Sequence, residues 1–291
     1  MHKERGDRPT LQTIALTAVA ILAFAANSLL CRLALQQGGI DPASFACIRL
    51  VSGAIMLTII VLCKSEPVVP NRTDWLAVAM LFAYVAFFSF AYLTLSAGTG
   101  ALILFGAVQL TMFSVGLRSG EKFGFIAWLG LALAVAGLVY LVSPGVASPP
   151  LFGAALMVVA GVSWGVYSLR GRGVADPLAA TARNFARAVP LALVLSLLFI
   201  AHAYADATGI VLAIASGALT SGIGYVIWYA ALNNLSAMRA ATVQLSVPLI
   251  ASFGGVVFLS EAITPRLVGA SAAILGGIAL VLTSRSRKPP P

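Results

Sequence analysis

Charge is what this sequence most lacks. Only 9% of its 291 residues are Asp, Glu, Lys or Arg, whereas 60% are hydrophobic. A soluble domain carries about a quarter charged residues, and a soluble core of this length would leave large apolar patches in water. The shortage of charge therefore excludes an ordinary soluble domain and predicts a protein embedded in a lipid bilayer.

Patterns that bind metals or cofactors are also missing. The three cysteines, Cys31, Cys47 and Cys63, lie in or beside apolar runs and form no Cys-x-x-Cys pair, and no His-rich tract occurs. We therefore expect no metal and no cofactor. The net charge of +9 does not indicate nucleic acid. The basic residues stand singly or in small groups between apolar runs, as they do in the cytoplasmic loops of membrane proteins.

The sequence contains ten apolar runs. Each is close to the ~20 residues that a helix needs to cross a bilayer. An Asp-Pro pair at residues 41–42 and another at 176–177 are typical of a capped helix start. The sequence therefore predicts an all-α membrane protein with ten transmembrane helices. The runs are 11–35, 43–63, 74–96, 99–118, 122–142, 151–170, 178–201, 208–232, 236–259 and 265–284.

Basic residues predict the orientation of these spans. Thirteen lysines and arginines fall on the side of the two termini, and only Arg266 falls on the opposite side. This bias places both termini in the cytoplasm of a bacterial-type inner membrane, as an even number of spans requires. The first apolar run continues to about Leu35, so we expect it to remain as a span rather than to be cleaved as a signal peptide.

Short matches at a constant offset indicate an internal repeat. The Asp-Pro pair at 41–42 recurs 135 residues later at 176–177, and Val-Gln-Leu at 108–110 recurs at the same offset at 243–245. We predict two five-helix repeats. Five is an odd number, so the second repeat must enter the membrane in the opposite sense.

The predicted repeats span residues 1–145 and 146–291. Inverted repeats of this kind are typical of secondary transporters, in which the substrate site lies between the halves near the middle of the membrane.

Longer motifs resemble a known family. Residues 243–250, 259–264, 267–270 and 275–278 resemble the end of an EamA-type domain of the drug/metabolite transporter superfamily, and residues 128–140 resemble the same element in the first half. Within that superfamily the chain is similar to the YddG-type exporters of amino acids, including aromatic ones. The resemblance implies a ten-span fold and export of small metabolites. The first half departs from it, with Ala-Asn at 26–27 where Trp-Gly is common, although Trp-Gly is present at 164–165.

Polar and aromatic side chains within the spans are the candidates for a substrate cavity, because polar groups are costly in hydrocarbon unless they face the interior. Gln109 and Gln244 match between the repeats and offer amides from both halves. The alternatives are hydrogen bonds that hold the bundle together and, for the aromatic residues, ordinary packing or an interfacial belt. The candidates are Asn27, Ser28, Tyr84, Phe88, Gln109, Trp164, Tyr167, Tyr225, Tyr229 and Gln244.

Pro248 lies one turn after Gln244 in the middle of the predicted ninth span. A proline there removes a helical hydrogen bond and kinks the helix, so Pro248 is a candidate hinge.

Four arginines lie within the predicted spans, whereas no acidic residue lies in mid-span. Arg49 is inside the second span. Snorkelling to the interface explains Arg32 and Arg183. Arg187 lies deeper, which leaves pairing, cavity lining, gating and contact with a substrate carboxylate open. A proton-coupled exporter of cationic drugs needs a buried carboxylate. A neutral or zwitterionic substrate therefore fits better.

These features together predict a transporter of small neutral or zwitterionic metabolites, an amino-acid exporter above all, that works by alternating access. Its partners would be the small-molecule substrate and the bilayer, and we expect a monomer. The alternative within the transporters is an exporter or permease for another class of metabolite or drug. An intramembrane enzyme is the alternative from another class, but it needs a nucleophile with a base, paired aspartates or a metal cluster, and none is visible. Nor is a channel filter loop apparent.

Overall fold

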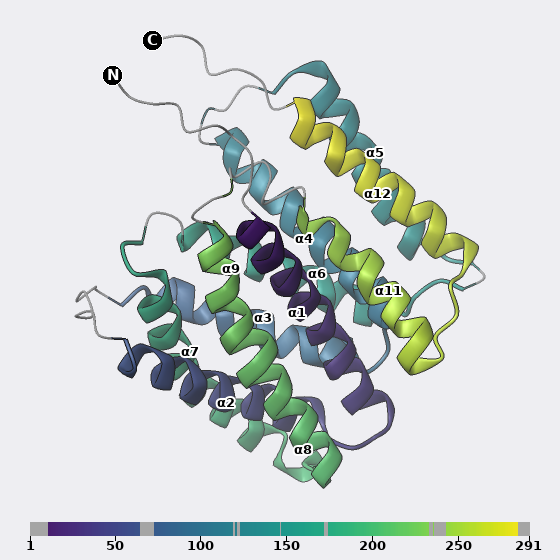
Figure 1. Cartoon of the computed structure of the whole chain (residues 1–291). Helices are drawn as coiled ribbons and strands as arrows, with labels where there is room; N and C mark the ends of the chain where they lie inside the picture. Colours follow the sequence, from purple (N-terminus) through teal and green to yellow (C-terminus); the bar gives the residue numbers. More distant parts are fainter. Residues whose placement is uncertain are drawn as a thin grey trace, which may run out of the picture.

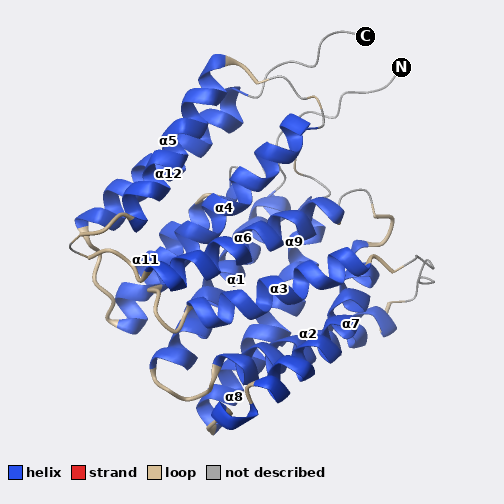
Figure 2. Ribbon diagram, turned by 180° about the vertical axis from the view of Figure 1, so that it is seen from behind, coloured by secondary structure: helices blue, strands red, loops and turns tan. Residues whose placement is uncertain are grey.

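The structure is a computed structural model that describes residues 11–64, 73–118, 120, 123–145, 147–171, 174–232, 235 and 243–284. In these ranges the regular structure is helical, and the extended pairing is limited to one antiparallel bridge between Ile40 and Ala205 (Figure 2). The prediction of an all-α protein is confirmed.

Ten spans follow one another along the described chain, as predicted. Eight of them are long and apolar enough to cross a membrane, and α3 and α11 are shorter apolar helices. The first five are α1 (Leu11–Gln36), α2 (Pro42–Leu62), α3 (Trp75–Ala91), α4 (Ala97–Arg118) and α5 (Phe125–Val142). The last five are α6 (Leu151–Arg170), α7 (Pro177–Leu198), the continuous span of α8 (Ala207–Ile214), η2 (Ala215–Ile223) and α9 (Gly224–Leu232), then α11 (Ser246–Leu259) and α12 (Pro265–Ser284). A short 3₁₀ turn, η1 (Ile200–His202), precedes α8.

Two helix ends differ from the predicted spans. The third span was expected to reach residue 96, but α3 ends at Ala91. The carbonyl oxygens of Tyr92 and Leu93, just after this end, accept hydrogen bonds from Arg32 and not from a further helical turn. The ninth span was expected to start at 236. Residues 236–242 lie outside the described ranges, and α11 begins at Ser246.

Residues 243–244 are also helical, and Leu245 between them and α11 has right-handed helical backbone angles, so Pro248 follows an interrupted helical turn. The interruption lies where the missing N–H of Pro248 removes a helical hydrogen bond. Its role as a hinge stays a prediction.

The Asp-Pro pairs start helices as predicted. Asp41 accepts hydrogen bonds from the backbone N–H groups of Ala43 and Ser44, at 3.0 and 2.9 Å, and Asp176 accepts one from Ala179 at 3.0 Å. Each carboxylate satisfies N–H groups that have no partner within the helix. The equivalent helices α2 and α7 therefore start in the same way.

The packing of the helices is preserved when the two repeats are exchanged. The first helices of the two repeats are α1 and α6. In the first repeat, the third and fourth helices, α3 and α4, pack against α6. In the second repeat, the corresponding helices, η2 and α11, pack against α1. The equivalent pairs α2 with α7 and α5 with α12 also lie side by side (Figure 1). Two inverted five-helix repeats are confirmed, whereas the boundary between residues 145 and 146 stays a prediction.

The bundle has two ends, which we name by the chain termini. The start of α1 and the end of α12 lie at the terminal face (Figure 1). The turns at residues 37–41, 92–96, 143–145, 147–150, 199–206 and 260–264 lie at the opposite end, which we call the distal face.

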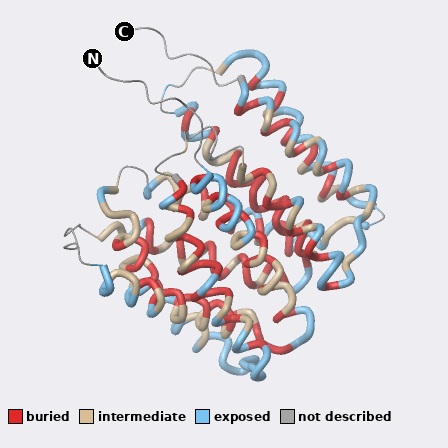
Figure 3. Tube along the Cα trace, viewed as in Figure 1, coloured by how far each residue is buried: buried red, intermediate tan, exposed pale blue. Residues whose placement is uncertain are grey.

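Exposed residues lie on the outside of the bundle, whereas buried residues lie where the helices meet (Figure 3). Many of the exposed residues are large and apolar. Leu198, Phe253 and Phe258 are 76%, 68% and 72% exposed. Such a surface suits lipid tails and not water. Small residues allow close helix contact, because a Cβ on Gly277 of α12 would overlap the carbonyl oxygen of Gly130 in α5.

Candidate functional site

A small cavity lies in the middle of the bundle, between the repeats. It has a volume of about 20 Å³ and is lined by α1, α2, α3 and α4 of the first repeat and by α6, η2 and α9 of the second. Six of the ten candidate residues line it: Asn27, Ser28, Tyr84, Phe88, Trp164 and Tyr225. We call it the central cavity; its other lining residues are Phe24, Arg49, Leu104, Phe105, Thr220 and Ser221.

Asn27 links the two repeats at this cavity. Its side chain is 5% exposed. The amide oxygen accepts hydrogen bonds from Ser216 Oγ at 2.7 Å and Thr220 Oγ1 at 3.2 Å, and the amide nitrogen donates to Tyr84 Oη at 3.5 Å. The two hydroxyls come from η2, a π-helix, a type of segment found mostly at functional sites.

Arg49 is the charged residue of the central cavity, and the sequence-based candidates did not include it. Its side chain is 1% exposed. Nε donates to Ser221 Oγ at 3.2 Å and Nη2 donates to Tyr84 Oη at 3.1 Å, while Nη1 is buried with no hydrogen-bond partner. The guanidinium also lies over the Phe88 ring, 5.0 Å from its centre. The signal in the sequence was a lone arginine in an apolar run that contains no acidic residue.

Aromatic rings packed at tilted angles separate the central cavity from the terminal face. The Trp164 ring centre lies 4.8 Å from that of Tyr84 and 5.3 Å from that of Tyr225. The next ring towards the terminal face is Tyr167, one helical turn along α6, at 5.6 Å from Trp164. These rings fill the space between the repeats.

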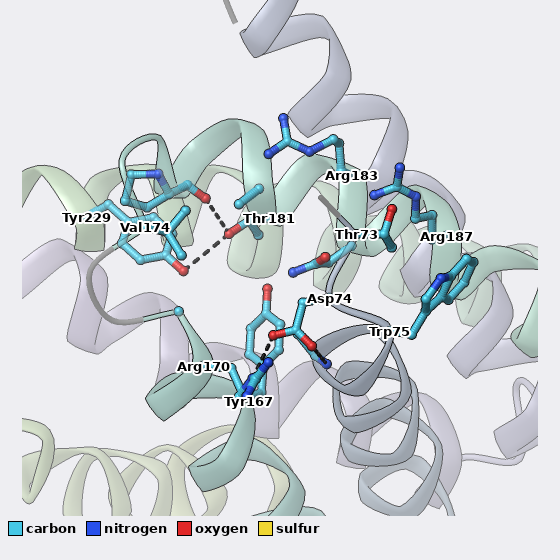
Figure 4. Close-up of a pocket in the computed structure, with 15 residues that line it drawn as sticks. Thr73, Asp74, Trp75, Tyr167, Arg170, Val174, Thr181, Arg183, Arg187 and Tyr229 are labelled. Carbon is cyan, nitrogen blue, oxygen red and sulfur yellow. Dashed lines mark hydrogen bonds and ion pairs between the residues drawn. The ribbon is translucent and has the colours of Figure 1, made fainter. Parts of the chain in front are cut away.

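A larger cavity of about 360 Å³ lies beyond the rings, between the start of α3, the end of α6 and the first turns of α7 (Figure 4). We call it the vestibule. Candidates Tyr167 and Tyr229 line it, and Tyr229 Oη is 3.2 Å from Thr181 Oγ1. Tyr225 and Tyr229 thus lie one turn apart and line different cavities.

Charges in the vestibule are mostly positive. Asp74 pairs with Arg170 at 2.6 Å, and the Arg170 guanidinium holds the pKa of the Asp74 carboxyl below its usual range. Arg183 and Arg187 project from α7 into the same space (Figure 4). Among the roles left open for Arg187, cavity lining agrees with this position, whereas the snorkelling assigned to Arg183 does not account for it.

The distal face is closed by contacts between the repeats. Asp41 N–H donates to the Tyr204 carbonyl and Tyr204 N–H donates to the Asp41 carboxylate, both at 3.0 Å, and Asp206 N–H donates to the Gly39 carbonyl at 2.7 Å. Nearby, Arg32 pairs with Glu261 at 3.2 Å. Snorkelling was therefore the wrong account of Arg32.

The two glutamines are not brought together at the central cavity. Gln109 is 8% exposed on α4 and its amide nitrogen is buried without a partner, while Gln244 is half-buried just before α11. Neither residue lines the central cavity or the vestibule. The idea of a substrate site built on this pair stays a prediction without support from these contacts.

Comparison with known proteins places the chain in a family. The model of the EamA-like transporter family matches twice, over residues 11–143 and 151–283. The chain therefore belongs to the EamA-like transporter family, and it is a multi-pass membrane transporter.

Similar proteins occur in bacteria and archaea. An uncharacterised protein of Pseudomonas aeruginosa is 50% identical over 277 residues, which covers 95% of this chain and 96% of that one. An uncharacterised transporter of Archaeoglobus fulgidus is 27% identical and covers 86% of this chain and 90% of its own. The uncharacterised transporter YoaV of Bacillus subtilis is 24% identical with the same coverage. A crystal structure matches with a TM-score of 0.68 at 18% identity over 94% of this chain and 98% of that one, a likeness of fold alone.

Proposed function

We propose that the chain exports small neutral or zwitterionic metabolites, amino acids including aromatic ones first among them, by alternating access. The observation that carries the proposal is the asymmetry of the two faces. The distal face is held closed by contacts between the repeats, whereas the terminal face has a vestibule of about 360 Å³ that leads towards the central cavity.

The orientation gives this asymmetry a direction. The excess of basic residues favours cytoplasmic termini in an inner membrane, so the vestibule faces the cytoplasm and the distal face is the outer one. A solute would enter through the vestibule and pass the rings of Trp164 and Tyr225. It would leave after the repeats rock and the contacts of Arg32 and Asp41 separate.

The lining of the central cavity supports the substrate class. Aromatic rings and hydroxyl groups predominate, and no Asp or Glu is among the lining residues. Rings of this kind suit apolar or aromatic side chains. The hydroxyl groups and the amide of Asn27 offer the few oriented polar contacts that small-molecule sites use.

Transport into proteoliposomes tests the proposal. A panel of radiolabelled amino acids is offered to vesicles that contain the protein and to empty vesicles, with and without an imposed pH gradient. We expect saturable uptake of several amino acids, with a raised KM in Trp164→Ala and Tyr225→Ala. The gradient distinguishes proton-coupled from facilitated transport.

The glutamine variants Gln109→Ala and Gln244→Ala test the predicted paired-amide site in the same assay. Retained uptake in both variants rules that site out. Uptake of no amino acid above empty vesicles overturns the amino-acid assignment. The panel then moves to nucleosides, sugars and drugs.

A further inference from the structure

The guanidinium of Arg49 is the least compensated charge in the described part of the chain. Its Nε and Nη2 donate to the uncharged hydroxyls of Ser221 and Tyr84, and Nη1 is buried without a partner. Burial of a cation is strongly unfavourable unless a counter-charge and hydrogen bonds compensate it. Arg49 is 1% exposed. It therefore lacks both a counter-charge and one set of hydrogen-bond acceptors.

The acidic residues in the described ranges are all engaged elsewhere. Asp41 and Asp206 hold backbone N–H groups at the distal face, and Asp176 caps α7. Asp74 pairs with Arg170, and Glu261 pairs with Arg32. None of them lines the central cavity. Among the described residues no negative charge faces Arg49, and the carboxylate of a bound solute is a counter-charge that fits its position in this cavity.

We propose that Nη1 of Arg49 binds the carboxylate of the transported solute in the central cavity. The inference rests on the proposed function and specifies a chemical group that its substrates carry, a carboxylate, which amino acids have. Nη1 of a guanidinium carries two N–H groups in the plane of the fork, and a charge-assisted hydrogen bond from such a group to a carboxylate is about twice as strong as one between neutral groups. Ser221 and Tyr84 hold the other two nitrogens, so the plane of the fork is fixed before the solute arrives.

The vestibule favours the same class of solute. Asp74 is neutralised by Arg170, whereas Arg183 and Arg187 have no acidic partner in the described ranges. Uncompensated positive charge in a cavity raises the local concentration of anions and lowers that of cations. An acid or zwitterion is therefore favoured over an amine before it reaches Arg49.

Binding at Arg49 is connected to the contact between the repeats. Arg49 belongs to α2 of the first repeat, and its partner Ser221 belongs to η2 of the second. A volume of about 20 Å³ holds little more than a water molecule. A carboxylic acid is admitted only when Trp164 and Tyr225 separate, so loading requires the repeats to move.

Binding to the purified protein is the primary test, because it does not depend on transport. Thermal unfolding is followed with L-phenylalanine, 3-phenylpropionate and L-phenylalaninamide, the last of which lacks the carboxylate. Loss of a charge-assisted hydrogen bond weakens binding by about 10- to 100-fold. We expect both acids to stabilise the wild type at concentrations about 10- to 100-fold below those at which the amide does.

Variants locate the effect. Arg49→Gln should remove the preference for acids over the amide, and Arg49→Lys, which keeps the charge but not the fork, should retain part of it. Arg266→Gln is the matched control, because Arg266 donates to carbonyl oxygens of α5 away from the cavity and its loss should leave the preference intact. If Arg49→Gln does not fold, the stabilisation of the wild type by the two acids, compared with that by the amide, still tests whether the cavity binds a carboxylate.

The outcomes separate the two proposals. Equal stabilisation by acids and amide, or no stabilisation by either acid, overturns the role of Arg49, even where vesicles accumulate amino acids. Stabilisation by acids that depends on Arg49, without uptake of any amino acid into vesicles, supports the carboxylate site and overturns the amino-acid exporter.

Discussion

Arg32 and Glu261 form an ion pair across the two repeats, with 3.2 Å between Nε and Oε1. The same carboxylate accepts hydrogen bonds from the Ala97 N–H at 2.9 and 3.1 Å, and Arg32 Nη1 donates to the Tyr92 carbonyl at 2.9 Å. Both side chains are largely buried, at 15% and 11% exposure. One pair thus ties α1 and the start of α4 to the segment before α12 and holds the distal face closed.

Replacing Glu261 by Gln should open that face. The variant loses the charge that pairs with Arg32, and a hydrogen bond to a charged group is worth about 1.5–3 kcal/mol. Cys31, which neighbours Arg32 and is 0% exposed, serves as the reporter in a background with Cys47→Ser and Cys63→Ser. Its labelling by a membrane-impermeant maleimide added at the distal face should accelerate by roughly tenfold or more.

The control for this prediction is Arg266→Gln, a charge change at the same face within the α5–α12 pair. Its labelling rate should match that of the parent. Equal rates in the Glu261→Gln variant and the parent would show that the ion pair does not hold the distal face closed.

Replacing Asn27 by Ala should destabilise the fold. The change leaves the Ser216 hydroxyl without its acceptor, whereas the Thr220 hydroxyl keeps its hydrogen bond to the Ser216 carbonyl oxygen. An unsatisfied buried polar group costs about 1–3 kcal/mol. Thermal unfolding in detergent measures the loss. Thr17→Val is the comparison on the same helix, because the Thr17 hydroxyl bonds only to the Thr13 carbonyl one turn back. A loss no larger than that of Thr17→Val argues against a structural role for the link between the repeats.

The Asp74 carboxylate both caps α3 and pairs with Arg170. Asn also caps helices well, so Asp74→Asn removes mainly the ion pair, whereas Asp74→Ala removes both and should cost about 1 kcal/mol more. Unfolding midpoints of the two variants measure the difference. Similar midpoints would mean that the cap contributes little.

The pH dependence of this pair follows from the lowered pKa of Asp74. A carboxyl whose folded pKa is depressed stabilises the fold fully above its unfolded pKa of about 3.9, and the contribution is lost as pH falls through the folded pKa. The stability difference between wild type and Asp74→Asn should therefore be constant from about pH 8 to 5 and should shrink only in stronger acid. A difference that shrinks near neutral pH contradicts the pairing.

Replacing Gly277 by Ala should disrupt the α5–α12 contact. The added methyl group meets the Gly130 carbonyl oxygen and the Ala134 N–H, and overpacking of this kind costs about 1–3 kcal/mol. The adjacent Gly276→Ala is the control, since a Cβ there meets nothing within 4 Å. Unfolding midpoints that fall equally in both variants would contradict the close contact.

The fold could be predicted from the sequence because the bilayer leaves few choices. Apolar length sets the spans, Asp-Pro pairs start α2 and α7, and the repeat fixes which helices are equivalent. The end of α3 at Ala91 could not be predicted in this way. It depends on Arg32, which is distant in the sequence and satisfies the carbonyl oxygens of the turn.

Part of the candidate site could also be predicted, because polar groups within spans face the interior. Tyr84, Trp164 and Tyr225 meet at the central cavity on that basis. The position of Arg49 in the central cavity was missed, since a sequence does not reveal which buried donors remain unpaired. The glutamine pair stays a prediction, because equivalent positions in two repeats need not converge on one cavity and Gln109 and Gln244 line neither cavity described above.

The contact of Gly130 with Gly277 also has a consequence for biosynthesis. α5 and α12 pack mainly on each other, yet one comes from each repeat. The ribosome completes α12 roughly 150 residues after α5, which corresponds to ~7–30 s of translation. During that interval α5 lies in the bilayer with its glycine face covered only by lipid. The closing step of assembly is therefore the arrival of the last helix, and a chain that stops before it leaves α5 without its partner.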